Sequence, residues 1–180
     1  TMRTPGHDRE LVVGLLYSEG IIREPAQLQQ LCVGDNPNSV KAQLATGHQL
    51  DMKKYQRHFF STSSCGVCGK MAIESLRLIA NPELKPGFPK VQASLIERLP
   101  ALMAARQSLF QQTGGVHAAA LFDVLGNIRV IFEDVGRHNA VDKVLGCYLL
   151  ENTLPPQDGV LLVSGRAGFE LVQKALVANI

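Results

Sequence analysis

With 180 residues, of which 46% are apolar, the chain is long enough to bury the core of one domain, or of one domain with a small appendage. It has no apolar run close to the roughly 18 residues that cross a bilayer. It also has no signal-peptide pattern, so we expect a cytoplasmic protein without membrane association. A net charge of +2, with acidic and basic residues interspersed, argues against a nucleic-acid partner.

The first predicted element is a helix over residues 7–18. Residues 4–8 supply the turn and capping residues that precede a helix, and Gly20 lies where a glycine C-cap is typical. The residues expected on its buried face are Leu11, Val12, Leu15 and Leu16.

Residues 30–34 and 39–46 are short runs in which apolar and polar residues alternate, with a turn at residues 35–38 between them. This pattern predicts a β-hairpin. Cys32 lies among apolar residues in it, so we expect a buried, structural thiol. Cys147, beside the apolar stripe of a later helix, is expected to be inert. A further strand is expected over residues 55–62.

Cys65 and Cys68 are the only closely spaced pair of reactive side chains, and they are the candidate catalytic residues. A helix is expected to begin near Cys65, since residues 71–80 repeat at helical spacing. A helix N-terminus and the nearby Lys70 both favour a thiolate. Such a pair can form a disulfide, share a metal or exchange sulfur. Because a zinc site needs about four N or S ligands, we predict no bound metal.

The Pro- and Gly-rich residues 81–89 predict a connection between an N-terminal lobe, residues 1–80, and an α/β core, residues 90–180. Helical spacing over residues 94–111 predicts a helix, with a break or a new start at Pro100. Strands are predicted over residues 116–122 and 128–135, joined by a turn at Gly126 and Asn127.

Two similar strand-to-helix junctions follow. The first, Gly136-Arg137, opens a helix in which His138 and Asp142 are at i and i+4 and can contact each other. The buried stripe of this helix is predicted to contain Val141, Val144, Leu145, Tyr148 and Leu149. The second junction, Gly165-Arg166, follows an apolar strand, residues 160–163, of the kind found in sheets covered on both faces. The helix after it is expected to turn Leu171, Val172, Ala175 and Leu176 inward.

Glycine-rich turns that open helices at the carboxyl ends of strands are natural anion sites, and arginine can bind a pyrophosphate through two parallel hydrogen bonds. If the two strands are parallel neighbours, both junctions lie at one edge of the sheet and form one pocket. The competing interpretation is ordinary capping of two unrelated helices. The predicted cofactor-binding residues are Gly136, Arg137, His138, Asp142, Lys143, Ser164, Gly165 and Arg166.

Four stretches, S-C-G-V-C-G-K, H-A-A-A, E-D-V-G-R-H-N-A-V-D-K-V-L-G and S-G-R-A-G-F-E-L-V-Q-K-A, together resemble the FdhD family, the formate dehydrogenase accessory sulfurtransferases. The resemblance covers nearly all of the chain. It implies an α/β fold (an α+β mixed sheet) with a cytidine-deaminase-like three-layer core and a small N-terminal β-containing lobe. It also implies a cytoplasmic homodimer. The family usually extends beyond both ends of this sequence, so we expect one continuous domain truncated at both ends.

The resemblance further implies a function. Such a protein takes sulfur from a cysteine desulfurase and passes it to the molybdenum or tungsten bis(molybdopterin guanine dinucleotide) cofactor of formate dehydrogenase, which it binds as a substrate. By the family's pattern Cys65 carries the persulfide and Cys68 is its companion.

Two alternative functions are a C-x-x-C thiol-disulfide oxidoreductase and a pterin-cofactor chaperone without chemistry of its own. Composition and spacing alone support redox chemistry and sulfur transfer almost equally. A zinc deaminase is excluded, because the H-x-E and P-C-x-x-C signature is absent.

Overall fold

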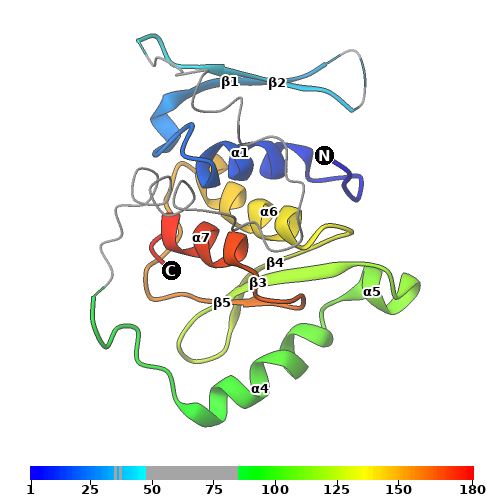
Figure 1. Cartoon of the computed structure of the whole chain (residues 1–180), viewed down its shortest axis with the longest axis vertical. Helices are drawn as coiled ribbons and strands as arrows, with labels where there is room; N and C mark the ends of the chain where they lie inside the picture. Colours follow the sequence, from blue (N-terminus) through cyan, green and yellow to red (C-terminus); the bar gives the residue numbers. More distant parts are fainter. Residues whose placement is uncertain (35, 37, 48–84) are drawn as a thin grey trace.

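The structure, a computed structural model, describes residues 1–34, 36, 38–47 and 85–180. The strand predicted over residues 55–62, Cys65, Cys68 and the helix expected to follow them lie outside the described residues. In chain order the elements are α1 (Asp8–Ser18), the 3-10 turn η1 (Pro25–Gln27), β1 (Leu28–Val33), β2 (Val40–Leu44), α4 (Ala93–Ala104), α5 (Ser108–Thr113), β3 (His117–Phe122), β4 (Ile128–Asp134), α6 (Arg137–Leu150), β5 (Val160–Val163) and α7 (Phe169–Val177) (Figure 1). No helix of this described part is long and apolar enough to cross a membrane.

The central sheet has the strand order β4-β3-β5, and β3 is antiparallel to both of its neighbours. The predicted β3–β4 hairpin is confirmed, and its turn holds Gly126 at φ +93°, a conformation that glycine adopts without strain. The condition stated for a single pocket, that the two strands are parallel neighbours, is met only in part, because β3 lies between β4 and β5. Since both are antiparallel to β3, β4 and β5 still run in the same direction. Their carboxyl ends therefore lie at the same edge of the sheet.

Helices cover both faces of this sheet (Figure 1). On one face, Ala119 and Leu121 of β3 pack in a cluster with residues of α1, α6 and α7. On the other, Ala118, Ala120 and Phe122 pack against α4. The prediction that residues 160–163 form a strand covered on both faces is therefore confirmed, as is the mixed α/β class. The cytidine-deaminase-like arrangement stays a prediction.

α1 packs directly against α6, and glycines make the contact. A Cβ added to Gly14 would lie 1.7 Å from the carbonyl oxygen of Asp142, and one added to Gly146 would lie 1.9 Å from that of Glu10. The predicted helix is confirmed, but of the four residues expected on its buried face only Leu11 is fully buried. The backbone contact brings the smallest residue of α1, rather than the most apolar ones, to the centre of the interface.

The predicted β1–β2 hairpin is confirmed, with its strands paired antiparallel. Leu31 packs against the core, whereas its neighbour Cys32 is exposed. The prediction of a buried thiol is wrong, because successive residues of a strand point to opposite faces and only one face of this hairpin packs inward. In Figure 1 the hairpin lies beyond α1, on the side away from the central sheet.

The break predicted at Pro100 falls later. Pro100 lies inside α4, which continues to Ala104, and the interruption before α5 is at residues 105–107. Pro100 is exposed, so water can hydrogen-bond to the carbonyl group that its missing N–H leaves free. The boundary expected between residues 80 and 90 lies mostly outside the described residues. Of the predicted N-terminal lobe, α1 packs in one hydrophobic cluster with α6 and α7 of the predicted core.

Candidate functional site

The two Gly-Arg junctions meet at the edge of the sheet where β4 and β5 end. A Cβ added to Gly165 would lie 3.0 Å from Cδ of Arg137. One residue farther along α6, Nε2 of His138 lies 2.9 Å from Oε2 of Glu170, in the first turn of α7. The starts of α6 and α7 are therefore in contact, even though β4 and β5 are not adjacent strands.

Arg137 lies partly buried between the junctions, and its Nε is buried without a hydrogen-bond partner among the described residues. Its aliphatic carbons approach Gly165, and Nδ1 of His117 lies on the same side, 3.4 Å from a Cβ added there. A Cβ at residue 165 would require the Arg137 side chain to shift by a few tenths of an ångström, so glycine permits the close approach. A buried donor without a partner costs about 1–3 kcal/mol. An anionic oxygen placed here would remove that cost, so the arrangement fits an anion.

His138 is half-buried beside Arg137. Burial lowers its imidazole pKa, while the nearby Glu170 carboxylate opposes the shift. The contact with Glu170 lacks hydrogen-bond geometry, so Nε2 of His138 has no hydrogen-bond partner among the described residues. The neutral ring is favoured near pH 7, and it can donate or accept one hydrogen bond without adding charge.

Asp142 does not form the expected contact with His138; it is buried against α7 and α1. Nζ of Lys174 donates to both of its carboxylate oxygens, at 2.8 and 3.0 Å. Ser18 Oγ donates to Oδ1 of Asp142 at 2.8 Å and accepts from Lys174 at 2.7 Å. All three residues are at most 6% exposed. This buried network fixes α7 against α6 and α1.

Lys174 also explains a wrong prediction in α7. Val172, expected to face inward, is 59% exposed, and Leu171 and Lys174 are the buried residues of this helix. An inward position is occupied by lysine because a buried carboxylate faces it.

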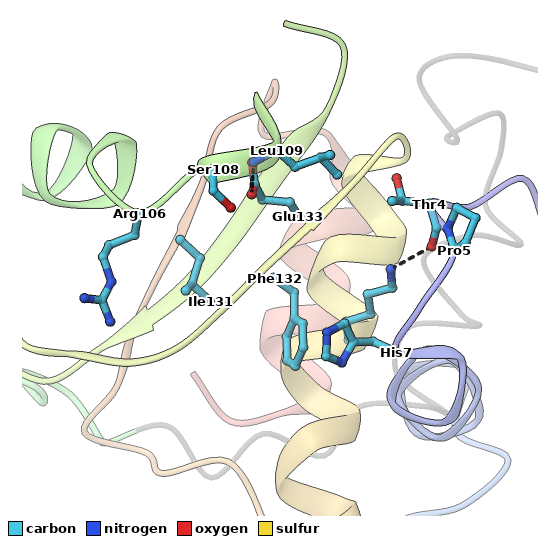
Figure 2. Close-up of a pocket in the computed structure, with 10 residues that line it drawn as sticks. Thr4, Pro5, His7, Arg106, Ser108, Leu109, Ile131, Phe132 and Glu133 are labelled. Atoms are coloured by element: carbon cyan, nitrogen blue, oxygen red, sulfur yellow. Dashed lines mark hydrogen bonds between the residues drawn. The ribbon is translucent and has the colours of Figure 1, made fainter. Parts of the chain in front are cut away.

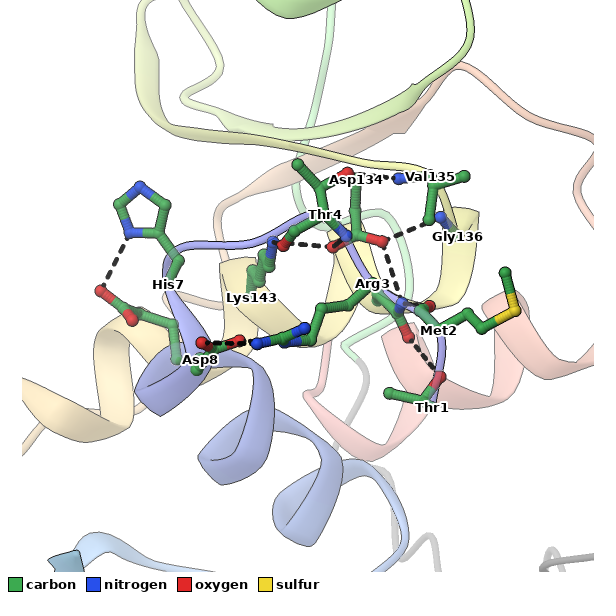
Figure 3. A network of polar contacts seen from close by, with 12 residues as sticks. Thr1, Met2, Arg3, Thr4, His7, Asp8, Asp134, Val135, Gly136 and Lys143 are labelled. Atoms are coloured by element: carbon green, nitrogen blue, oxygen red, sulfur yellow. Dashed lines mark hydrogen bonds and ion pairs between the residues drawn. The ribbon is translucent and has the colours of Figure 1, made fainter. Parts of the chain in front are cut away.

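A second buried ion pair holds the first junction (Figure 3). Nζ of Lys143 lies 2.7 Å from Oδ2 of Asp134, and both side chains are almost completely buried. Asp134 also accepts hydrogen bonds from the backbone N–H groups of Gly136, at 2.9 Å, and of Thr4, at 3.2 Å. Asn139 donates to Asp134 at 2.9 Å. These bonds fix the turn from β4 into α6 beneath the N-terminal segment.

Asp142 and Lys143, predicted at the sequence level to line the site or to fix its geometry, are thus both held in buried ion pairs. Sequence reasoning missed their partners Ser18 and Asp134. The available signal was the recurrence of a Val-x-Lys pattern after each junction, with a lysine inside an otherwise apolar stripe. A buried lysine needs a buried acid.

The polar residues at the second junction are Ser164 and Arg166, and they have different roles. Oγ of Ser164 accepts a hydrogen bond from the backbone N–H of Ala118 at 2.8 Å, which ties the junction to β3. Arg166 is exposed at the rim and is not buried between the helices as Arg137 is. Arg137 is therefore the arginine that the fold positions most closely between the two helix starts.

The thiols of the candidate catalytic pair, Cys65 and Cys68, lie outside the described residues. Of the two described cysteines, Cys32 is exposed and Cys147 is partly buried. Burial raises the pKa of the Cys147 thiol and disfavours the reactive thiolate, in agreement with its predicted inertness. Within the described ranges no group of three or more His, Cys, Asp or Glu residues could hold a metal ion.

These features define a mixed α/β protein in which two helix starts converge at one sheet edge. The chain belongs to the FdhD/NarQ family, whose model matches residues 1–180, and the resemblance seen in the sequence motifs is confirmed. The fold is similar to a crystal structure described as that of a formate dehydrogenase accessory protein from Desulfotalea psychrophila. That match has a TM-score of 0.69 at 23% identity and covers 99% of this chain and 64% of the other.

Several curated relatives are named "Sulfur carrier protein FdhD". The one from Mycolicibacterium paratuberculosis is 46% identical over 190 residues, which cover 100% of this chain and 69% of the relative. The one from Streptomyces avermitilis is 44% identical, with 100% and 67% covered. The one from Sulfurisphaera tokodaii is 40% identical, with 99% and 66% covered. The chain thus spans about two thirds of the length of these relatives.

Proposed function

We propose that this chain is the sulfur-carrying part of an accessory protein for formate dehydrogenase. The observation that carries the proposal is its 46% identity to a sulfur carrier protein over its whole length, together with a C-x-x-C pair in its own sequence. Cysteine desulfurase is the proposed sulfur donor, and formate dehydrogenase is the proposed recipient. The reaction is placed in the cytoplasm, where thiols stay reduced, and a homodimer is the proposed working unit.

The proposed chemistry needs no external oxidant. The Cys65 thiolate attacks the terminal sulfur of the donor's cysteine persulfide, so that one S–S bond breaks as another forms. The donor leaves as a thiolate, and Cys65 becomes the persulfide. The sequence around Cys65 favours this step, because a helix start and Lys70 would stabilise the thiolate. In the second step the S–S bond at Cys65 breaks, Cys65 leaves as a thiolate, and the terminal sulfur passes to the molybdenum or tungsten cofactor. That cofactor is the substrate, and in its reduced state it would supply the two electrons that bring the sulfur to the sulfide level.

The junctions are the proposed binding site for the guanine dinucleotide part of that substrate. The supporting observation is the buried Nε of Arg137, which has no partner among the described residues and lies between two helix starts. Arg137 would contact a phosphate from inside the site, Arg166 would contact one from the rim, and His138 would offer a neutral hydrogen-bonding group. Asp142 and Lys143 act here by holding α6 in place.

Persulfide formation tests the proposal most directly. After incubation with a cysteine desulfurase and cysteine, mass spectrometry of the peptide that contains Cys65 and Cys68 should show the addition of one sulfur atom. Reduction with dithiothreitol should remove it. An intramolecular disulfide without added sulfur would instead favour the thiol-disulfide oxidoreductase, and an unmodified pair would favour the chaperone without sulfur chemistry.

GDP binding tests the anion site separately. We expect Arg137→Ala to weaken GDP binding by about one to two decades, because a charge-assisted hydrogen bond is worth about 1.5–3 kcal/mol. Arg137→Lys should recover little of it, since lysine lacks the planar fork of arginine. Isothermal titration calorimetry is the measurement, and Arg98→Ala, an exposed change on α4, is the matched control. Equal GDP affinity in the Arg137 and Arg98 variants, both folded by circular dichroism, would remove Arg137 from the site.

A further inference from the structure

A second site opens along β4, beside the first junction and not between the two helix starts; Thr4 and Lys143, which help to hold that junction, are among its lining residues. It is a cleft of about 350 Å³ with walls on both sides (Figure 2). Arg106 and Ser108, from the link between α4 and α5 and the start of α5, form one wall. Pro5 and His7, from the segment before α1, form the other, and Ile131 and Glu133 of β4 lie between the walls.

β4 is an edge strand of the described sheet, so only one side of its backbone is hydrogen-bonded to another strand, β3. Ala118 of β3 exchanges hydrogen bonds with Ser164, so its polar backbone groups face β5. Because strand residues alternate, those of Ala119 face β4 and its partner Phe132. The N–H and C=O groups of Ile131 and Glu133 consequently point away from β3, toward the cleft. No described residue pairs with them, so they form an open strand edge.

The groups that flank this edge favour one kind of occupant. The exposed Arg106 guanidinium has no hydrogen bond or ion pair with another described side chain. Glu133, the acid nearest the edge, is already engaged, because its carboxylate accepts hydrogen bonds from the backbone N–H groups of Leu109 and Phe110, each at 2.8 Å. Among the described lining residues, Arg106 is therefore the cation available to a ligand, and the one carboxylate, that of Glu133, is held by backbone N–H groups.

The opposite wall is partly aromatic. The rings of His7 and Phe132 make an edge-to-face contact with centroids 4.8 Å apart. His7 also has a left-handed backbone, at φ 56°, at the N-cap of α1. An added strand would alternate its side chains between this wall and the wall of Arg106.

We propose that the cleft binds an extended peptide segment of a partner protein as an additional strand on the edge of β4. The backbone of the peptide would pair with Ile131 and Glu133, and an acidic side chain would pair with Arg106. This mode of recognition takes affinity from main-chain hydrogen bonds and specificity from alternate side chains. Walls on both sides of the edge suit a single extended chain. The inference does not depend on the proposed sulfur chemistry.

The test uses the 180-residue chain and a fluorescein-labelled, acetylated hexapeptide of alternating valine and glutamate. Fluorescence anisotropy should show saturable binding, and the peptide with lysine in place of glutamate should bind more weakly. Arg106→Glu should weaken the glutamate peptide about tenfold and reverse the preference. Arg98→Glu, also exposed but outside the cleft, should change neither affinity.

Backbone N-methylation separates strand addition from simple charge attraction. Methyl groups on the alternate residues that face β4 should abolish binding, whereas methyl groups on the other residues should leave it intact. Equal effects of both methylation patterns would overturn the proposal. So would the absence of binding at millimolar peptide, or equal losses in the Arg106 and Arg98 variants.

Discussion

Replacement of Cys65 by alanine is expected to abolish activation of formate dehydrogenase in a strain that lacks its own accessory protein. In the proposed function this thiolate accepts the transferred sulfur, and alanine has no atom that could form the S–S bond. The loss should be complete, because hydrogen bonds and binding energy cannot replace a missing nucleophile. Formate-dependent dye reduction in cell extracts is the measurement.

The described cysteines provide matched controls for this change. Cys32→Ala removes an exposed thiol on β1, and Cys147→Ala removes a partly buried thiol whose pKa is raised by burial. Both variants should activate the enzyme as the unchanged chain does. If Cys65→Ala also does so, Cys65 is not the sulfur carrier, and Cys68→Ala becomes the deciding variant.

The second large effect is expected in stability. Lys174→Met should lower the free energy of unfolding by about 3–5 kcal/mol, because it leaves the carboxylate of Asp142 buried without its cation. The double change Asp142→Leu with Lys174→Met removes both charges, and it should restore most of the loss. Urea denaturation followed by circular dichroism measures both quantities.

An exposed ion pair gives the comparison for this prediction. Arg129 and Asp158 are 2.8 Å apart at the surface, and Arg129→Met should cost less than about 1 kcal/mol. If Lys174→Met lowers the free energy of unfolding no more than Arg129→Met does, the buried network stabilises the fold no more than the exposed ion pair. If the double variant is no more stable than Lys174→Met, the loss comes from packing and not from the unpaired charge.

Periodicity was enough to predict that the β3–β4 hairpin, the β1–β2 hairpin and helices α1 and α6 exist. It did not predict that α6 is covered on more than one side, with residues 139–146 all buried. It was not enough where a contact depends on a distant residue. Gly14 is central in α1 because α6 approaches it, and no pattern within residues 7–18 reveals that approach. Pro100 illustrates the same point, since an exposed proline leaves a helix intact that is held by its other face.

The candidate site was predictable only in outline. The sequence indicated two similar junctions, and the structure brings Arg137 and Gly165 together through a sheet order that was not foreseen. Whether a charged residue lies in solvent or in an ion pair depends on its partner. Asp142 therefore could not be assigned to Lys174 and Ser18 from its spacing to His138 alone.

The glycine contact between α1 and α6 also determines how Asp142 is held. α1 contacts this residue twice, since Gly14 closes on its backbone carbonyl and Ser18, one turn farther along, hydrogen-bonds to its carboxylate. The backbone contact involves no rotatable side chain, so no loss of side-chain conformational entropy opposes it. These two contacts position Asp142 against α1 without any contribution from α7. After loss of Lys174 the main chain of Asp142 would stay at the helix crossing, so the carboxylate could approach water only by a change in its own side-chain torsions.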